Sequence, residues 1–190
     1  MVLLPAQQAT RNVSEQHFGP TLPCYFGTGA YIFGGQAGVN AHARAFPWVT
    51  RLLCSVVRSL CPAAYFSNVF LSYNIASKPH VDCHNHRHVP NYLIPLSRWE
   101  GGDLWVASPR GCTQREPEGP CGRVMPISLP YISFNPRVQH AVLPWTRNRF
   151  VLGAFHIRED WRLNDASSDF LSDQGFQLYS LQPARSDPYM

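Results

Sequence analysis

The sequence predicts a mainly β domain, a sandwich or barrel of short strands with at least one helix packed against its outside. The first observation is composition: 190 residues with 45% hydrophobic and 15% charged residues describe one folded domain with a sizeable core. The second is a clear helical pattern that precedes residue 62. The third is the succession of short β-branched and aromatic runs that follows it, separated by turn residues.

The predicted helix spans residues 46–61, within the stretch FPWVTRLLCSVVRSLCP. Pro47 stands in its first turn, and the pattern stops before Pro62. Its apolar positions recur at helical spacing and are expected to face the core, whereas Arg51, Ser55 and Arg58 share the opposite face. The apolar positions are Val49, Leu52, Leu53, Val56, Val57 and Leu60.

Residues 1–45 precede this helix as an N-terminal extension. Residues 1–29 are expected to be extended or loop, and AYIF, residues 30–33, is a strand candidate. Residues 64–158 are expected to form the β core. Its strand candidates are the runs AYFSNVFLSYN, NYLIPL, GDLWVAS, PISLPYISF, QHAVLP and NRFVLGAFHI. The acidic tail, residues 159–190, is expected to wrap on the body, with a helical turn near SSDFLSD, and to fray at its end.

Charge is distributed unevenly along the chain. Residues 1–155 carry 13 Lys and Arg against 6 Asp and Glu, a net +7, whereas residues 156–190 carry 3 against 6, a net −3. A basic body favours a polyanionic partner such as nucleic acid. A solvated, arginine-rich surface without such a partner explains the same numbers, and composition alone leaves both interpretations open.

No apolar run approaches the roughly 18 residues of a membrane span, and the opening MVLLPAQQATR lacks the features of a secretory signal. We therefore expect a monomeric intracellular protein without membrane association, in the nucleus or the cytoplasm. The six cysteines include no CxxC pair, so a zinc ribbon is not expected. Cys112 and Cys121 flank a Gly- and Pro-rich loop, where either a disulfide or two free thiols fit the spacing.

Residues 78–90, KPHVDCHNHRHVP, gather side chains of the types that bind metals. His80 and Asp82 are two residues apart, so on an extended strand both point to the same side and can reach one ion. Two histidines and a carboxylate form the facial triad of non-haem iron oxygenases, which leaves three coordination positions open. His140, near the start of QHAVLPWTRNRFVLGAF, is the candidate for the third ligand.

Arg149 follows His140 by nine residues and begins an apolar strand. Arginine grips a carboxylate with two parallel donors, and its burial in an apolar barrel demands such a partner. An H-x-D pair is common by chance, but its combination with a later histidine and a strand-borne arginine is much more specific. The pattern indicates an iron centre whose co-substrate, 2-oxoglutarate, is held through its far carboxylate by Arg149.

These stretches resemble the Fe(II)- and 2-oxoglutarate-dependent dioxygenases, and the resemblance covers residues 64–156. Within that superfamily, FSNVFLSYNIASKPHVDCHN, EGGDLWV and QHAVLPWTRNRFVLGAF are most similar to the ten-eleven-translocation and J-binding proteins, which oxidise the methyl group of 5-methylcytosine or thymine. The resemblance implies a double-stranded β-helix, or jelly-roll, core. It also implies Fe(II) as the cofactor, with 2-oxoglutarate and dioxygen as co-substrates.

The resemblance assigns the iron ligands and the 2-oxoglutarate anchor to His80, Asp82, His140 and Arg149. Asn85 completes H-x-D-x-x-N and matches the asparagine that contacts the target base, although Asn is also a normal turn residue and a loop cap is the other interpretation. His156 is the nearest match to a base-contacting histidine, but it follows Arg149 by seven residues where the family has eight. On a regular strand that offset puts His156 on the opposite face.

For three histidines and two aromatic residues in or near residues 78–90, the sequence also leaves two interpretations open. His84, His86 and His88 alternate and either hold a second metal or are solvated. Tyr92 and Trp105, on flanking strands, are either core residues or cofactor contacts.

The expected function is hydroxylation of a C–H bond, in the methyl group of 5-methylcytosine or thymine in DNA or RNA. Hydroxylation rather than halogenation is implied because the halogenating relatives lack the carboxylate ligand that Asp82 supplies. The insert SPRGCTQREPEGPCGR, residues 108–123, offers Arg110, Arg115 and Arg123 to phosphates. A prolyl-type protein hydroxylase or a small-molecule hydroxylase is the alternative. A non-catalytic metal-binding jelly roll is a second alternative, which leaves Arg149 unexplained.

Overall fold

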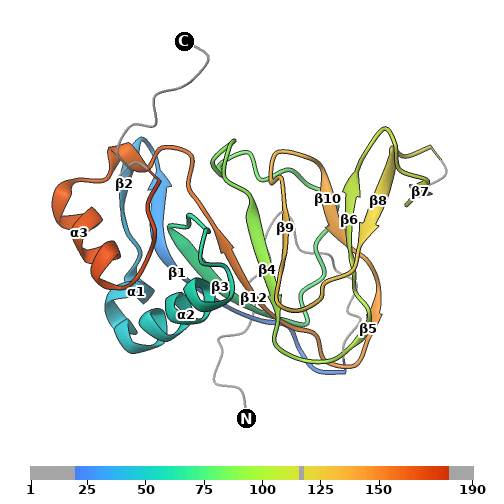
Figure 1. The fold of residues 1–190 in the computed structure, drawn as a ribbon, viewed down its shortest axis with the longest axis horizontal. Coiled ribbons are helices and arrows are strands. Elements are labelled where there is room, and N and C mark those ends of the chain that lie inside the picture. The colour runs from blue at the N-terminus through green and yellow to red at the C-terminus, as the bar shows by residue number, and fades with distance from the viewer. Residues whose placement is uncertain (1–19, 116–117, 180–190) are drawn as a thin grey trace.

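A computed structural model describes residues 20–115 and 118–179 of the chain, and it is mainly β (Figure 1). The strands are β1 (Cys24–Phe33), β2 (Gln36–Val39), β3 (Asn68–Tyr73), β4 (Asn91–Pro95), β5 (Glu100–Gly101), β6 (Leu104–Ala107), β7 (Thr113–Gln114), β8 (Cys121–Met125), β9 (Ile132–Phe134), β10 (His140–Val142), β11 (Trp145–Thr146) and β12 (Phe150–Phe155). The helices are α1 (Ala41–Ala45), α2 (Pro47–Leu60), α3 (Asp165–Asp173) and the single 3₁₀ turn η1 (Asp160–Arg162).

Two antiparallel sheets make a jelly roll. The larger has the order β2-β1-β3-β12-β4-β9, the smaller has the order β10-β6-β8-β7, and β5 and β11 form a separate two-stranded ribbon. The chain passes repeatedly between the two sheets of the core, because β3, β4, β9 and β12 lie in one while β6, β8 and β10 lie in the other. This arrangement is the double-stranded β-helix that the sequence predicts.

Apolar side chains from both sheets meet inside the barrel. Leu93, Phe134 and Val151 come from the larger sheet. Leu104 and Val106 come from the smaller sheet and pack against them. The five side chains are at most 8% exposed, so the barrel interior is a packed core.

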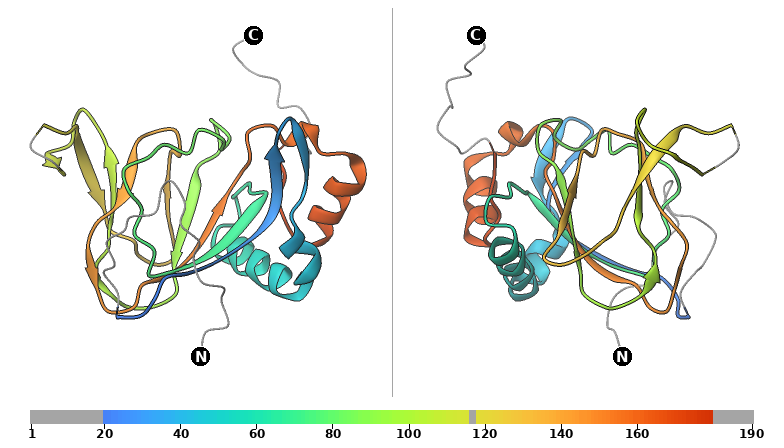
Figure 2. Two further views of the ribbon diagram at one scale, coloured as in Figure 1. Left: turned by 180° about the vertical axis from the view of Figure 1, so that it is seen from behind. Right: turned by 45° about the vertical axis from the view of Figure 1, so that its right-hand side comes forward.

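A second core lies between the larger sheet and the helices, which cover its outer face (Figure 2). Phe66 and Val69 from the sheet side pack there with Val57 of α2 and Leu171 of α3, and all four are fully buried. The larger sheet therefore has one face toward the helices and one toward the barrel, and side chains alternate between the two environments along each strand.

Strand β1 shows this alternation and makes the later part of the N-terminal extension, which was expected to be extended or loop, a regular strand. It pairs with β3 from Cys24↔Tyr73 to Gly29↔Asn68, so the extension widens the larger sheet. Thr28 turns to the helix side, where its hydroxyl lies 2.8 Å from that of Thr50. The sequence prediction found only the last four residues of this strand.

Helix α2 matches the predicted segment within one residue at each end, Pro47–Leu60 against 46–61. Phe46 is not helical (φ −127°, ψ 57°), as expected for a residue that precedes proline. The predicted core face was partly wrong, because Val49 is 39% and Leu52 is 62% exposed. The buried face is instead Thr50, Leu53, Cys54 and Val57.

Two shorter helices depart from the sequence expectation. Helix α1 was not predicted, although Asn40 caps it by accepting a hydrogen bond from the Ala43 amide at 2.9 Å. The helical turn expected near residues 167–173 is the nine-residue helix α3, whose Asn164 caps it in the same way. The tail therefore packs on the body as far as residue 179, and its expected fraying concerns residues outside the described ranges.

The cysteines and helices of the described residues settle two smaller points. Cys112 and Cys121 are both free thiols, so the disulfide interpretation is not realised.

No helix within residues 20–115 and 118–179 combines the length and apolar character needed to cross a membrane.

Candidate active site

Backbone pairing holds His80 and His140 side by side. Each residue donates its amide to the carbonyl oxygen of the other, at 3.0 Å from His80 and 2.9 Å from His140. An antiparallel pair of this kind places its two side chains on the same face, and the two imidazole centroids are 4.4 Å apart. The two residues, 60 positions apart in the chain, therefore present their rings to one point.

Asp82 completes the cluster. His80 Nε2 lies 3.4 Å from Asp82 Oδ1, and His140 Nε2 lies 3.6 Å from Asp82 Oδ2. Each histidine engages a backbone carbonyl through Nδ1, that of Lys78 at 2.7 Å for His80 and that of Val138 at 2.9 Å for His140. Since Nδ1 carries the proton in these contacts, the lone pair of each Nε2 is available to an ion.

The protonation states of the cluster suit a metal site. Burial opposes ionisation of Asp82, but its hydrogen bond with His80 and the charges of both histidines hold its pKa below the usual range. Burial lowers the pKa of His140, which favours the neutral imidazole. Burial acts in the same direction on His80, yet its contacts with Asp82 and the Lys78 carbonyl raise its pKa overall.

The cluster of His80, Asp82 and His140 stands alone among the described residues, where no other three His, Cys, Asp or Glu side chains converge on a possible ion site. The second metal site considered for the neighbouring histidines is not formed. His86 packs instead against Tyr179, with ring centroids 4.8 Å apart. One carboxylate and two neutral imidazoles are the donor set expected for non-haem Fe(II), so the residues present fit that ion.

Arg149 immediately precedes β12 and turns into the barrel, because it shares the parity of the interior residue Val151. Its side chain is almost fully buried, at 2% exposure, and burial lowers the pKa of its guanidinium to about 10 despite the attraction of Asp103. The guanidinium carbon lies 5.2 Å from the ring centroid of Trp99 and 5.6 Å from that of Trp145. Two indoles thus cover a buried cation.

No carboxylate of the described residues lies within 4 Å of the Arg149 guanidinium, although Nε donates to the Gly102 carbonyl at 3.1 Å. Its backbone is fixed by Asn74, whose side-chain oxygen accepts the Arg149 amide at 2.8 Å. A buried cation without a carboxylate in direct contact is costly. Such a site is suited to an anionic ligand that arrives from solution, with Nη1 and Nη2 as its donors.

Arg147, two residues earlier, has the opposite character. Its side chain is 67% exposed and pairs with Glu100 at 3.0 Å on the surface. Its φ of +65° breaks the strand pattern just before β12, so spacing alone does not bring it to the side of Arg149. An exposed, already paired arginine is a poor anchor for a ligand inside the barrel.

Asn85 is buried next to the cluster of His80, Asp82 and His140. Its amide nitrogen donates to Asn91 Oδ1 at 3.0 Å and lies 3.4 Å from Asp82 Oδ2. The loop that carries it is tied to the larger sheet by an antiparallel bridge between Asn85 and Ile157. The side-chain oxygen of Asn85 has no partner among the described residues, so one acceptor remains beside the metal ligands.

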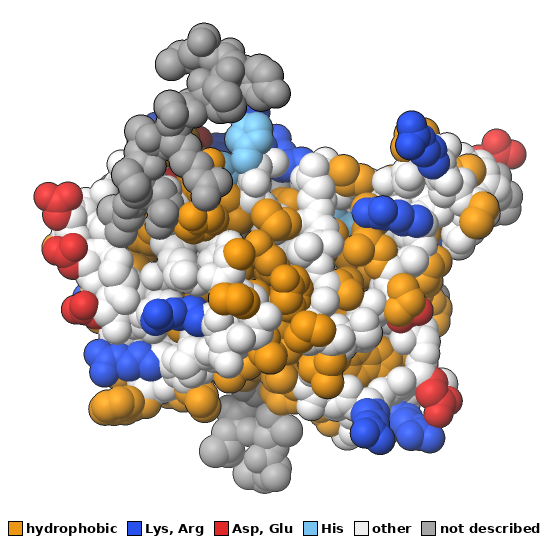
Figure 3. All heavy atoms as spheres, viewed as in Figure 1, with side chains coloured by type: hydrophobic (Ala, Val, Ile, Leu, Met, Phe, Trp, Pro, Cys, Tyr) orange, Lys and Arg blue, Asp and Glu red, His pale blue; other side chains and the backbone are white. Residues whose placement is uncertain are grey.

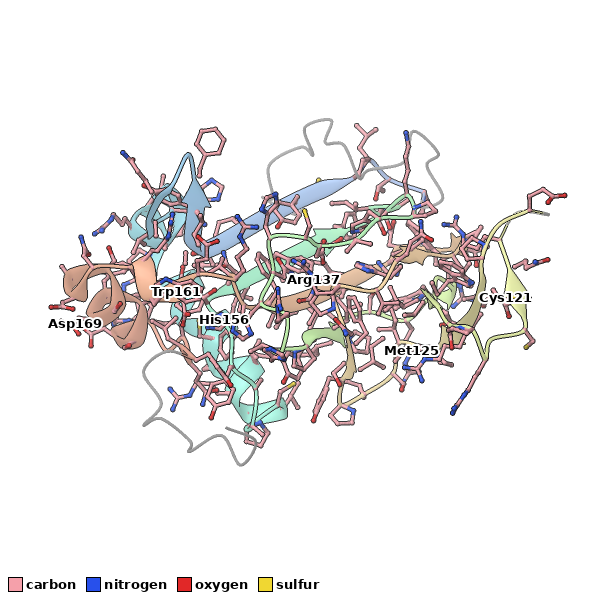
Figure 4. The ribbon with its side chains drawn as sticks, turned by 90° about the horizontal axis from the view of Figure 1, so that it is seen from above. Cys121, Met125, Arg137, His156, Trp161 and Asp169 are labelled. Carbon is pink, nitrogen blue, oxygen red and sulfur yellow. The ribbon has the colours of Figure 1, made fainter. Side chains whose placement is uncertain are left out.

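His156 lies on the opposite side of the larger sheet from Arg149, as its seven-residue offset predicts. Strand β12 pairs with β3 in unbroken register, without a bulge that could turn the residue around. His156 is fully buried, and its Nε2 accepts the backbone amide of Tyr179 at 3.0 Å. In the view from above it lies on the α3 side of Arg137 (Figure 4). This arrangement does not favour the substrate contact, which stays a prediction.

The sequence interpretation missed Tyr25 of β1. Its ring stacks on Phe70 with centroids 5.7 Å apart, on the barrel side of the sheet. Burial and the nearby charge of Asp82 raise the pKa of its hydroxyl to about 12, so it stays protonated. No motif marks this tyrosine, because it reaches the barrel side of the sheet only through the pairing of β1 with β3.

Tyr92 and Trp105 are core residues in the structure. Tyr92 is 9% exposed and belongs to the core under the helices. Trp105 is 1% exposed, and its indole nitrogen donates to the Thr113 carbonyl at 3.0 Å. The indoles that border the anion position are Trp99 and Trp145 instead.

Comparison with known proteins gives fold-level similarity only. No protein-family model matches the chain, and no curated protein matches it. Among solved structures, a 2OG-Fe(II) oxygenase family oxidoreductase from Burkholderia pseudomallei is 15% identical with a TM-score of 0.45, covering 76% of this chain and 73% of that one. A Pseudomonas putida prolyl-4-hydroxylase is 17% identical with a TM-score of 0.42, covering 82% and 78%.

A ribosomal oxygenase from Escherichia coli, solved with cobalt and succinic acid, is 12% identical with a TM-score of 0.38. The match covers 86% of this chain and 50% of that one. At such identities and TM-scores these similarities assign neither a family nor a substrate, and the function depends on the side chains of the site.

Proposed function

We propose that this protein is an Fe(II)- and 2-oxoglutarate-dependent dioxygenase that hydroxylates a C–H bond. The observation that carries the proposal is the combination of two features in one barrel. One is the cluster of His80, Asp82 and His140, which fits Fe(II). The other is Arg149, a buried cation that has no carboxylate within 4 Å among the described residues. A metal-binding jelly roll without oxygenase activity explains the first feature and leaves the second without a purpose.

The two indoles next to Arg149 strengthen the proposal. Trp99 and Trp145 exclude water from the guanidinium, and a hydrogen bond between ions is stronger where water is absent. The planar two-donor fork of arginine matches a carboxylate. 2-Oxoglutarate carries a carboxylate at one end, which fits Arg149, and a metal-chelating ketoacid at the other, which fits an ion held by His80, Asp82 and His140.

When bound, Fe(II) and 2-oxoglutarate supply the oxidising chemistry, in which 2-oxoglutarate and dioxygen become succinate and carbon dioxide while one oxygen atom enters a substrate C–H bond. His80, Asp82 and His140 would hold the ion, and Arg149 would hold the far carboxylate. Tyr25 lies on the same side of the sheet, stacked on Phe70, and its hydroxyl stays neutral because burial and the charge of Asp82 raise its pKa to about 12.

For the substrate, we propose the methyl group of a modified base, 5-methylcytosine or thymine, in nucleic acid. Support comes from Asn85, whose free side-chain oxygen lies in the loop of the metal ligands and could accept an N–H from a base. A target in a duplex would have to be flipped out of the stack, at a cost of a few kcal/mol.

Unpaired surface cations add support for a polyanionic substrate. Seven exposed cationic side chains from residues 78–137 have no carboxylate within 4 Å among the described residues: Lys78, Arg87, Arg98, Arg110, Arg115, Arg123 and Arg137. Figure 3 shows Lys and Arg side chains toward the β6–β8 end, with acidic side chains among them, and further acidic side chains along the α3 edge. The cations at the β6–β8 end would contact a phosphate backbone.

The cofactor half of the proposal is tested by anaerobic titration of the apoprotein with Fe(II) and 2-oxoglutarate. We expect the weak visible charge-transfer band of a metal-bound ketoacid, which requires both components and is lost in His80→Ala. If the band does not form with wild-type protein under saturating conditions, the dioxygenase assignment is wrong.

The substrate half needs a panel of DNA and RNA oligonucleotides, single- and double-stranded, that contain 5-methylcytosine or thymine. Mass spectrometry should detect hydroxymethyl products. If a preparation that forms the visible band oxidises none of them, the nucleic-acid proposal fails. Hydroxylation of a peptide or of a small molecule would then identify the alternative substrate class.

A further inference from the structure

The first residue of β4, Asn91, makes a hydrogen-bonded chain with two residues of the metal loop. Its amide nitrogen donates to Asp82 Oδ2 at 2.9 Å, and its side-chain oxygen accepts from Asn85 at 3.0 Å. Asn85 also points its amide nitrogen at Asp82 Oδ2, at 3.4 Å. Two amide donors therefore converge on the same oxygen of the metal ligand.

The strand itself does not require an amide at position 91. Pairing of Asn91 with Phe134 and of the next residues with β9 and β12 uses backbone groups only. The side chain is 6% exposed next to Leu93 and Ile94, and an apolar residue there would avoid the cost of burying an amide. Compared with an apolar residue at this position, the asparagine adds only its contacts with Asp82 and Asn85.

Asp82 needs such support because it lies in an irregular turn between His80 and β4. Its backbone makes two hydrogen bonds, from the Asp82 amide to the Pro136 carbonyl at 2.9 Å and from the Asn85 amide to the Asp82 carbonyl at 3.0 Å, and neither one fixes the rotation of the carboxylate. A carboxylate on such a turn can rotate unless its oxygens are held. Each carboxylate oxygen lies near one histidine, Oδ1 at 3.4 Å from His80 Nε2 and Oδ2 at 3.6 Å from His140 Nε2. Only Oδ2 also accepts from the amides of Asn91 and Asn85, so Oδ1 is the oxygen without an amide donor.

We propose that Asn91 is a positioning residue that makes Asp82 a one-oxygen metal ligand, with Oδ1 given to the ion and Oδ2 retained by Asn91 and Asn85. The inference rests on the metal site of the proposed function. A carboxylate that offered both oxygens would fill a second position on the ion. By withholding Oδ2, Asn91 keeps three positions open, two for a chelating ketoacid and one for dioxygen.

The test measures Mn(II) binding to the apoprotein by isothermal titration calorimetry, without 2-oxoglutarate or substrate. Asn91→Leu removes the donor at similar volume, and we expect Mn(II) affinity to fall about 10- to 100-fold, as is typical when support for a metal ligand is lost. Asn85→Ala should have a smaller effect, because its contact with Oδ2 is longer.

A second readout is the affinity of 2-oxoglutarate for protein saturated with Mn(II). It should fall in Asn91→Leu even at full metal occupancy, since a carboxylate that turns to chelate removes one open position. A residue that only stabilised the fold would change the unfolding temperature and leave both affinities of the folded protein unchanged.

Asn68 provides the matched control. It is a strand asparagine of similar burial, 7% exposed, whose amide donates to the Ala30 carbonyl at 2.7 Å. Asn68→Leu should keep Mn(II) affinity within about twofold of wild type, against the larger loss expected for Asn91→Leu. Circular dichroism checks folding, and Asn91→Ala replaces Asn91→Leu if the latter does not fold.

Equal loss of Mn(II) affinity in Asn68→Leu and Asn91→Leu would overturn the positioning role, and so would wild-type affinity in folded Asn91→Leu or Asn91→Ala. Wild-type protein that binds no Mn(II) would instead overturn the metal site of the proposed function itself. The two failures are therefore distinguishable.

Discussion

The ring of Phe70 covers the backbone of Gly153 across the neighbouring strands β3 and β12. A Cβ added at Gly153 would lie 2.0 Å from Phe70 Cζ, well inside van der Waals contact. The two residues are direct partners in the register of the larger sheet, on its barrel face. The aromatic ring therefore occupies space that any larger residue at position 153 would need.

Gly153→Ala should destabilise the protein by about 1–3 kcal/mol, the usual cost of overpacking a filled core. The same substitution in a Phe70→Leu background should cost less, because the smaller side chain leaves room for the added methyl group. Thermal or denaturant unfolding of the four proteins of this double-mutant cycle measures the coupling. An equal cost in both backgrounds would mean that Phe70 and Gly153 do not compete for this space.

His80→Ala, Asp82→Ala and His140→Ala should each abolish succinate formation coupled to substrate while the protein stays folded. A three-ligand site with three open positions has no ligand to spare. Coupled assays with circular dichroism on each variant measure this. Any single variant that keeps full activity removes that residue from the ligand set.

Arg149→Lys should raise the concentration of 2-oxoglutarate needed for half-maximal activity, because an ammonium group cannot reproduce the planar fork. Excess co-substrate should partly restore turnover. Arg147→Lys is the matched control, since it alters an exposed arginine two residues away that pairs with Glu100. If Arg149→Lys leaves the requirement unchanged, the anchor lies elsewhere, and an effect of Arg147→Lys would locate it there.

Binding to methylated oligonucleotides should weaken steeply with salt, by roughly 0.7–0.9 log units per contacted phosphate for each log unit of salt. Replacing Arg110, Arg115 and Arg123 by Gln should reduce that slope. Arg51→Gln, on the outer face of α2, is the control and should leave it unchanged. Fluorescence anisotropy over a salt series provides the slopes, and a slope insensitive to the three substitutions removes the insert from the phosphate-binding surface.

Asn85→Ala should cut turnover of the methylated base while 2-oxoglutarate binding changes little, because its free oxygen serves the substrate. Product formation by mass spectrometry and co-substrate affinity by titration separate the two effects. Unchanged turnover with a weaker metal affinity would assign Asn85 to the support of Asp82 alone.

The sequence was sufficient for the parts of the site that local spacing determines. The H-x-D spacing places His80 and Asp82 together, and the parity of an unbroken strand correctly predicts that His156 turns away from Arg149. His140 could be predicted only as a candidate by residue type and order. The antiparallel bridge that brings it to His80 is a property of the folded chain.

The remaining residues of the site depend on strand pairing between distant segments. Tyr25 reaches the barrel because β1 pairs with β3, and Asn91 reaches Asp82 because the loop between them folds back onto β4. Neither residue has a motif of its own. The exposure of Leu52 could not be predicted either, since helical periodicity gives an apolar stripe but not the part of it that the sheet covers.

The loop of residues 80–88 is attached to both sheets. His80 pairs with β10 of the smaller sheet, whereas Asn85 bridges to Ile157 and the His86 amide donates to the His156 carbonyl at 2.8 Å, next to the larger sheet. Binding of a metal ion to this loop would therefore stabilise the folded barrel, because the loop joins the two sheets. An ion at 100 times its dissociation constant adds about 2.7 kcal/mol to the unfolding free energy, so the melting temperature would itself report the metal status of the protein.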